Sequence, residues 1–104
     1  MDWRVVDACV HRCSTATQQA YAAAKAAAEI KVRVADERRG RITVATIFVH
    51  TVEGMKCRAD VRRNSEHDYR VLNQNRPIPG FDEPSLIEFG RACICAVRKN
   101  GRRG

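Results

Sequence analysis

Cysteines are the first side chains in this 104-residue chain that could do chemistry. Four of the five fall in two close pairs, Cys9 with Cys13 and Cys93 with Cys95, and four thiolates are a common ligand set for structural zinc. The spacing argues against such a site. On a helix, residues two apart point in nearly opposite directions, so Cys93 and Cys95 would not face one ion. We therefore expect five reduced cysteines that pack as small apolar residues, with no metal and no cofactor.

Histidines are the second set of candidate chemical groups. His50 ends an apolar run, and His67 lies in a polar stretch. Such a pair could act as acid and base in a metal-independent ribonuclease, with Arg58 or Arg62 on the phosphate. Only residue type supports this hypothesis, because no phosphate-binding loop, dinucleotide-binding, serine-hydrolase or zinc-protease motif occurs. The sequence therefore favours a protein that binds without catalysis, and it yields no catalytic residue.

Basic residues form the third set, and they carry the clearest pattern. The chain has 19 Lys and Arg against 12 Asp and Glu, a net charge of +7. Lys31 and Arg33 alternate with apolar residues in one run, and Lys56, Arg58 and Arg62 do so in another. If the apolar residues of both runs face the core, these five basic side chains share the opposite face.

The segment 30–63 that carries these residues predicts a meander of three antiparallel strands. Alternation marks 30–34, and Gly40 suits a turn over 36–40. The run 41–51 is rich in β-branched residues on both faces, as expected of a central strand. A turn over 52–55 leads into the third strand, 56–63.

Helices are predicted on both sides of this meander. Apolar and small residues recur at three- and four-residue steps over 2–29, which predicts one long helix with a heptad-like seam. A second interpretation is a short helix or strand before Ser14, with a fresh helix starting at a Thr15–Gln18 capping box. The second helix spans 82–100, with Asp82 or Glu83 as its cap and Asn100-Gly101 as its stop.

These elements predict an α+β fold in a single domain, 1–104. The segments are a long N-terminal helix (1–29), a three- to four-stranded antiparallel meander (30–63), a loop with a candidate edge strand (64–81), a C-terminal helix (82–100) and a basic tail (101–104). In the loop, Tyr69, Val71 and Leu72 suit the edge strand, and Pro79-Gly80 suits a type II turn. Both helices are expected on one face of the sheet.

The predicted function is binding of nucleic acid or another polyanion through Lys31, Arg33, Lys56, Arg58 and Arg62. Phe48 is the one aromatic residue of the meander, so the face would hold a backbone rather than read bases. The alternative is a protein-interaction regulator, or a phage-encoded inhibitor, that docks on an acidic or nucleoprotein partner. The sequence has no apolar stretch of membrane-span length and no visible secretory signal, which favours a cytoplasmic protein. A homodimer through the 2–29 helix or a sheet edge is also expected.

Overall fold

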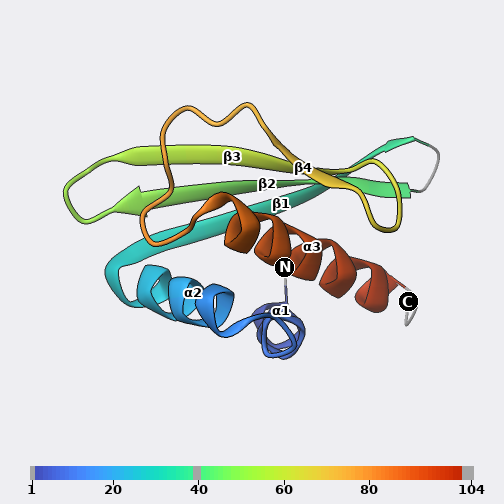
Figure 1. Ribbon diagram of the computed structural model, residues 1–104, viewed down its shortest axis with the longest axis horizontal. Coiled ribbons are helices and arrows are strands. Elements are labelled where there is room, and N and C mark those ends of the chain that lie inside the picture. Colours follow the sequence, from blue (N-terminus) through green and yellow to red (C-terminus); the bar gives the residue numbers. More distant parts are fainter. Residues whose placement is uncertain (1, 39–40, 102–104) are drawn as a thin grey trace.

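The computed structural model describes residues 2–38 and 41–101, in which three helices pack against a four-stranded antiparallel sheet. The strands lie side by side in the order β1-β2-β3-β4. Figure 1 shows the sheet as one layer and the helices as a second layer on one side of it. The α+β class, the meander and the fourth strand are thus confirmed. The elements are α1 (Trp3–Val10), α2 (Thr15–Ala27), β1 (Ala28–Arg38), β2 (Arg41–Thr51), β3 (Lys56–Arg63), β4 (Tyr69–Leu72) and α3 (Glu83–Gly101).

The prediction of one long helix over 2–29 is wrong, because the chain breaks after α1 and starts again at α2. Ser14 has extended backbone, and its side chain accepts a hydrogen bond from the Thr17 N–H, as an N-cap does. Gln18 Nε2 donates to the carbonyl oxygens of His11 (3.1 Å) and Cys13 (2.9 Å), which satisfies the end of the preceding turn. The second interpretation is therefore close, although the cap lies at Ser14 and not at Thr15.

Two turns connect the three strands of the predicted meander. Gly54 has a φ of +90°, and the Thr51 N–H donates to the Met55 carbonyl at 2.9 Å, so the predicted turn over 52–55 is confirmed. β1 starts two residues before Ile30 and continues to Arg38, with register shifts after Ala35. The prediction of a turn over 36–40 is therefore wrong for 36–38, which belong to the strand. The predicted turn residue Gly40 lies outside the described residues.

Helix α3 starts where the sequence indicates and ends later. Asp82 and Ser85 form a reciprocal capping box, since the Ser85 N–H donates to Asp82 Oδ1 and the Asp82 N–H donates to Ser85 Oγ, both at 3.0 Å. Before it, the Phe81 N–H donates to the Ile78 carbonyl and Gly80 has a φ of +85°, as a type II turn requires. The helix includes Asn100 and Gly101, so these residues are not its stop. The predicted tail residues 102–104 lie outside the described part of the chain.

The hydrophobic core lies between the helix layer and the sheet. Apolar residues of β2 and β3 face it, among them Ile47 and Val61, which are fully buried. Phe89 of α3 sits at its centre, with ring centroids 5.2 Å from Tyr21 and 5.4 Å from Phe81. None of the described helices has the length and apolar character that a membrane span requires. Most residues of the heptad-like seam in 2–29 pack into this core and cannot contact a second copy. The buried ones are Val6, Val10, Thr17, Ala20 and Ala24.

A carboxylate on α3 holds the N-terminus of α2. Glu88 accepts hydrogen bonds from Ser14 Oγ at 2.6 Å and from Thr17 Oγ1 at 2.5 Å. These bonds, that from Ser14 first, hold the pKa of Glu88 below its ordinary value of 4.5. Because the folded-state pKa is the lower one, the stabilisation is fully present above about pH 4.5. It is lost as the pH falls through the folded-state value.

We expect Glu88→Gln to lower the free energy of unfolding by about 1–3 kcal/mol near neutral pH, since hydrogen bonds to a charged acceptor are lost. The difference from the wild type should shrink well below about pH 4, where the wild-type carboxylate takes up a proton. Urea unfolding across this pH range measures both effects. Glu66→Gln, an exposed carboxylate in the β3–β4 connection, is the matched control. A Glu88→Gln deficit that is the same at every pH would contradict the assignment.

Candidate nucleic-acid interface

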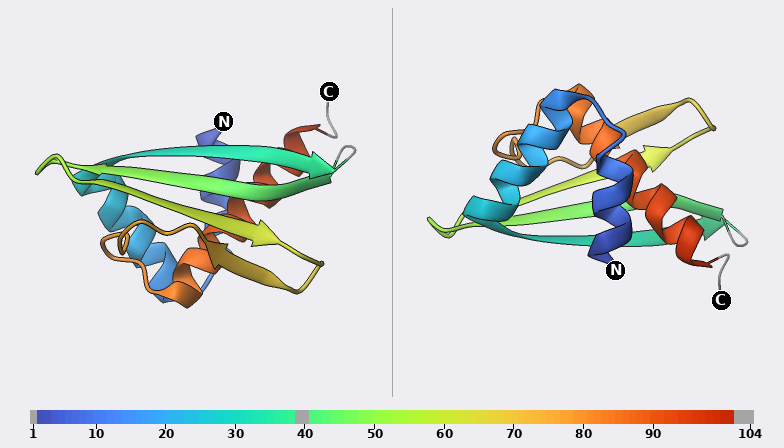
Figure 2. Two further views of the ribbon diagram at one scale, coloured as in Figure 1. Left: turned by 90° about the horizontal axis from the view of Figure 1, so that it is seen from above. Right: turned by 90° about the horizontal axis from the view of Figure 1, so that it is seen from below.

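The sheet face without helices carries all five basic residues predicted from the sequence. Directly opposed residues of antiparallel strands point to the same side. The register sets Lys31 beside Phe48 and Phe48 beside Arg58, and it sets Arg33 and Asp60 on either side of Thr46. Figure 2 (left) looks onto this face, with the helices behind the strands. We call it the basic face and define it by Lys31, Arg33, Lys56, Arg58 and Arg62, of which the first four are exposed and the last is half-buried.

Arg58 lies at the middle of the basic face and is held from two sides. Its guanidinium carbon sits 5.6 Å from the centroid of the Phe48 ring, and its Nε lies 3.8 Å from Asp60 Oδ1. Asp60 Oδ2 accepts a hydrogen bond from Asn73 Nδ2 at 3.0 Å. Thr46 and Asp60 are buried, so the acid is covered. A planar guanidinium oriented in this way can bind a phosphate through two parallel hydrogen bonds.

Arg70 is a basic residue of this face that was not predicted from the sequence. Arg70 on β4 pairs with Arg62 on β3, so both point to the side of the basic face. Arg70 is exposed, and its Nε lies 3.5 Å from Asp68 Oδ1. The sequence pattern could have predicted it, because side chains alternate along Tyr69–Leu72 and the apolar Val71 would face the core. Arg70 would then point to the opposite face. Two carboxylates, the exposed Glu29 and the buried Asp60, share the face.

The two histidines of the ribonuclease hypothesis lie at opposite ends of the sheet. His50 pairs with Lys56 at the start of β3, whereas His67 belongs to the connection that follows Arg63 at its end. Seven residues of strand separate Lys56 from Arg63, which corresponds to about 23 Å. An acid and a base that distance apart do not act on one phosphate. The structure therefore does not bring this candidate pair together.

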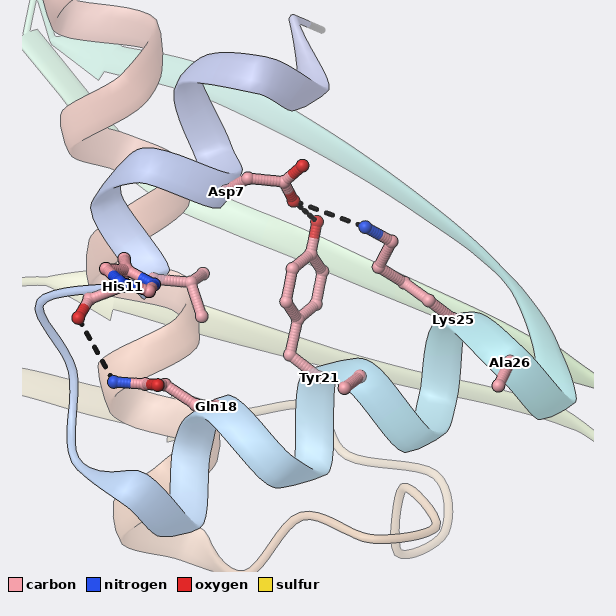
Figure 3. Close-up of a pocket in the computed structure, with 8 residues that line it drawn as sticks. Asp7, His11, Gln18, Tyr21, Lys25 and Ala26 are labelled. Atoms are coloured by element: carbon pink, nitrogen blue, oxygen red, sulfur yellow. Dashed lines mark hydrogen bonds and ion pairs between the residues drawn. The ribbon is translucent and has the colours of Figure 1, made fainter.

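A pocket of about 540 Å³ between α1 and α2 contains several polar side chains, as Figure 3 shows. Asp7 accepts hydrogen bonds from the Tyr21 hydroxyl at 2.5 Å and from Lys25 Nζ at 3.3 Å. The Tyr21 bond holds the pKa of Asp7 below its usual range, while burial, reinforced by Asp7, raises the pKa of Tyr21. Asp7 on α1 thus accepts hydrogen bonds from Tyr21 and Lys25 on α2, and these bonds connect the two helices. The arrangement is that of a structural cross-link.

A second pocket, between α1 and α3, is lined by thiols and charged groups. They are Cys9, Cys13, Cys95, Arg12, Glu88, Arg91 and Lys99, together with Ala92. Burial, and after it the Glu88 carboxylate, raises the pKa of the Cys13 thiol, and burial raises that of Cys93. All five cysteines of the chain are free thiols. Within residues 2–38 and 41–101, no three or more His, Cys, Asp or Glu side chains are arranged to hold a metal ion.

Comparison of the chain with protein-family models, curated proteins and solved structures finds no significant match. The function is therefore inferred from the geometry and charge of the sites themselves. Of these, the basic face is the exposed and extended one, and its basic residues outnumber its two carboxylates, Glu29, which lies 3.3 Å from Lys31, and Asp60, which lies 3.8 Å from Arg58.

Proposed function

We propose that this protein binds nucleic acid through the basic face, without sequence preference. The observation that supports the proposal is the antiparallel register, which aligns Lys31, Arg33, Lys56, Arg58 and Arg62 on the face that no helix covers. Clustered Lys and Arg side chains neutralise phosphates and release the counterions bound to them. The proposed partner is thus a duplex backbone or a chemically similar polyanion.

Contacts to the backbone, rather than to bases, fit the composition of the face. Sheets that read RNA bases present exposed aromatic rings for stacking. Phe48 is half-buried, and the Arg58 guanidinium lies over its ring. Lys56 and Arg62 are six residues apart on β3, or about 20 Å, which equals about six base-pair steps of a duplex. A face of this length can contact several phosphates. Its described residues present no exposed aromatic ring on which a base could stack.

The size of the face sets the expected salt dependence. With three to five phosphate contacts, log affinity should fall with log salt at a slope between about −3 and −4.5. Fluorescence anisotropy with nuclease-treated protein and two duplexes of unrelated sequence, from about 50 to 200 mM salt, measures this slope. Both duplexes should give the same slope and nearly the same affinity. Absence of salt-sensitive binding to duplex DNA and RNA at about 50 mM salt would contradict the proposal and favour an acidic protein surface as the partner.

The same proposal assigns the protein to the cytoplasm, where nucleic acid is accessible to it, and treats it as a binding protein and not an enzyme. The proposal also includes a homodimer. The sequence suggested the 2–29 helix or a sheet edge as the contact between the two copies. The sheet edge is the better candidate, because Val6, Val10, Ala20 and Ala24 of the helical segment are buried within one copy.

A further inference from the structure

The two edges of the sheet differ in how far their backbone N–H and C=O groups are hydrogen-bonded. β4 is four residues long and pairs with Asp60–Arg63, the second half of β3. Beside the first half, Asn75 takes the place of a strand. Its N–H donates to the Arg58 carbonyl at 3.2 Å, its Oδ1 accepts from the Arg58 N–H at 2.8 Å, and its Nδ2 donates to the Lys56 carbonyl at 3.1 Å. The backbone groups along this edge of β3 are therefore largely satisfied.

The β1 edge has no such cover among the described residues. β1 spans Ala28–Arg38, its described strand pairing is with β2, and Figure 2 (right) shows it along the free border of the sheet. On its outer side, alternate N–H and C=O groups are left to solvent. The first register shift from β2 falls between Ala35 and Asp36, so the regular part that a new strand could pair with is 28–35.

An apolar stripe follows this free edge on the helix side of the sheet. Ile30, Val32 and Val34 are only half-buried, although their neighbours on β2, Ile47 and Val49, are buried. Trp3 and Val5 of α1 are half-buried as well and pack against the same core. Covering the stripe would remove apolar surface from water, which stabilises an association in proportion to the area buried.

We propose that β1 pairs antiparallel with β1 of a second copy of this chain. A two-fold axis perpendicular to the sheet relates such strands and sets residues of the same face opposite one another. With the axis at Ile30, Glu29 lies opposite Lys31 of the second copy. With the axis at Lys31, it lies opposite Arg33. Either register sets Glu29 opposite a basic residue on one face and apolar side chains opposite each other on the other face. The axis at Lys31 also sets the two Lys31 side chains opposite one another, so charge complementarity favours the axis at Ile30.

The dimer would join both sheets into one, with both basic faces on the same side. The inference rests on the edge and not on nucleic-acid binding, and it is tested without nucleic acid. Sedimentation of nuclease-treated, reduced protein should give twice the 11.7 kDa monomer mass at about 100 μM and dissociation on dilution to about 1 μM. Hydrogen exchange of the 28–35 amides should slow as the protein concentration rises. A monomer at about 100 μM would overturn the proposal.

Charge exchange identifies the interface and its register. Glu29→Lys should weaken the dimer about tenfold, since two attractive cross-strand pairs become repulsive. Adding Lys31→Glu should restore it if the axis lies at Ile30, and adding Arg33→Glu should restore it if the axis lies at Lys31. Failure of both exchanges to restore a weakened dimer, or a dimer that Glu29→Lys leaves unchanged, would overturn the proposal.

A charge placed in the apolar stripe gives a larger effect. Val32→Lys should abolish the dimer at about 100 μM, because an inward-pointing charge blocks edge pairing. Leu72→Lys is the control on the opposite edge, where Leu72 is 39% exposed. It should leave the dimer intact. If circular dichroism shows that Val32→Lys does not fold, the Glu29 charge exchanges decide the matter. A dimer that survives Val32→Lys in a folded variant would place the contact elsewhere.

Discussion

Gly90→Ala should lower the free energy of unfolding by about 2–3 kcal/mol, despite the higher helix propensity of alanine. A Cβ at residue 90 would lie 2.4 Å from Val61 Cβ and 2.6 Å from each of its Cγ atoms. Val61 is fully buried on β3, so it has no free space to move into. Helix α3 would have to shift away from the sheet. Chemical denaturation of the wild type and the variant measures the cost.

A double-mutant cycle separates this steric cause from a general helix effect. Val61→Ala alone should destabilise the protein by about 0.5–2 kcal/mol, because it removes buried methyl groups. In the Gly90→Ala background it also removes two of the three closest contacts, so its cost should be smaller or change sign. Additive effects of the two substitutions, or a Gly90→Ala variant that is as stable as the wild type, would contradict the close approach of α3 to β3.

Arg33→Ala combined with Lys56→Ala should weaken duplex binding about 100-fold at about 50 mM salt, if each residue neutralises one phosphate. Both side chains are exposed on the basic face. Arg58 is less suitable, because its removal would leave the buried Asp60 carboxylate without its nearby cation. The free energy of unfolding should change little, since exposed charges contribute little to stability.

The matched control removes the same charge from another part of the surface. Arg4 is exposed in the first turn of α1, and Arg12 is exposed two residues after its end. α1 belongs to the helix layer, on the side of the sheet opposite to the basic face (Figure 1). Arg4→Ala combined with Arg12→Ala should therefore reduce affinity far less than the basic-face variant. Equal losses in both variants would indicate a response to net charge and not a site.

The sheet was predictable from sequence because a strand with one buried face has a period of two. Alternation about Val32 and about Ala59 fixes which side chains share a face, and the 52–55 turn fixes which strands are neighbours. The basic face follows from these two facts. The partial cover of its centre does not, because the burial of Asp60 depends on Asn73, thirteen residues away, and on the cross-strand neighbours that surround it.

The local pattern did not decide between a continuous helix and the break at 11–14, which was predicted only as the second interpretation. Val10, Cys13 and Thr17 keep helical spacing across it, so the seam looks continuous. Local hydrogen bonds of Ser14 and Gln18 stabilise the break, and a distant one adds to them: the Glu88 carboxylate accepts from Ser14 Oγ, 74 residues away. Contacts of this kind appear only when α3 is docked. Helix α3 also continues past its predicted end and includes Asn100 and Gly101, although both residue types commonly end helices.

A salt titration that compares three proteins on one duplex tests the proposed function most directly. Wild type and the Arg4→Ala/Arg12→Ala control should show the same slope of log affinity against log salt. The Arg33→Ala/Lys56→Ala variant should show a slope that is shallower by about two, because two phosphate contacts are lost. Three parallel lines, with the basic-face variant as steep as the wild type, would contradict binding through the basic face.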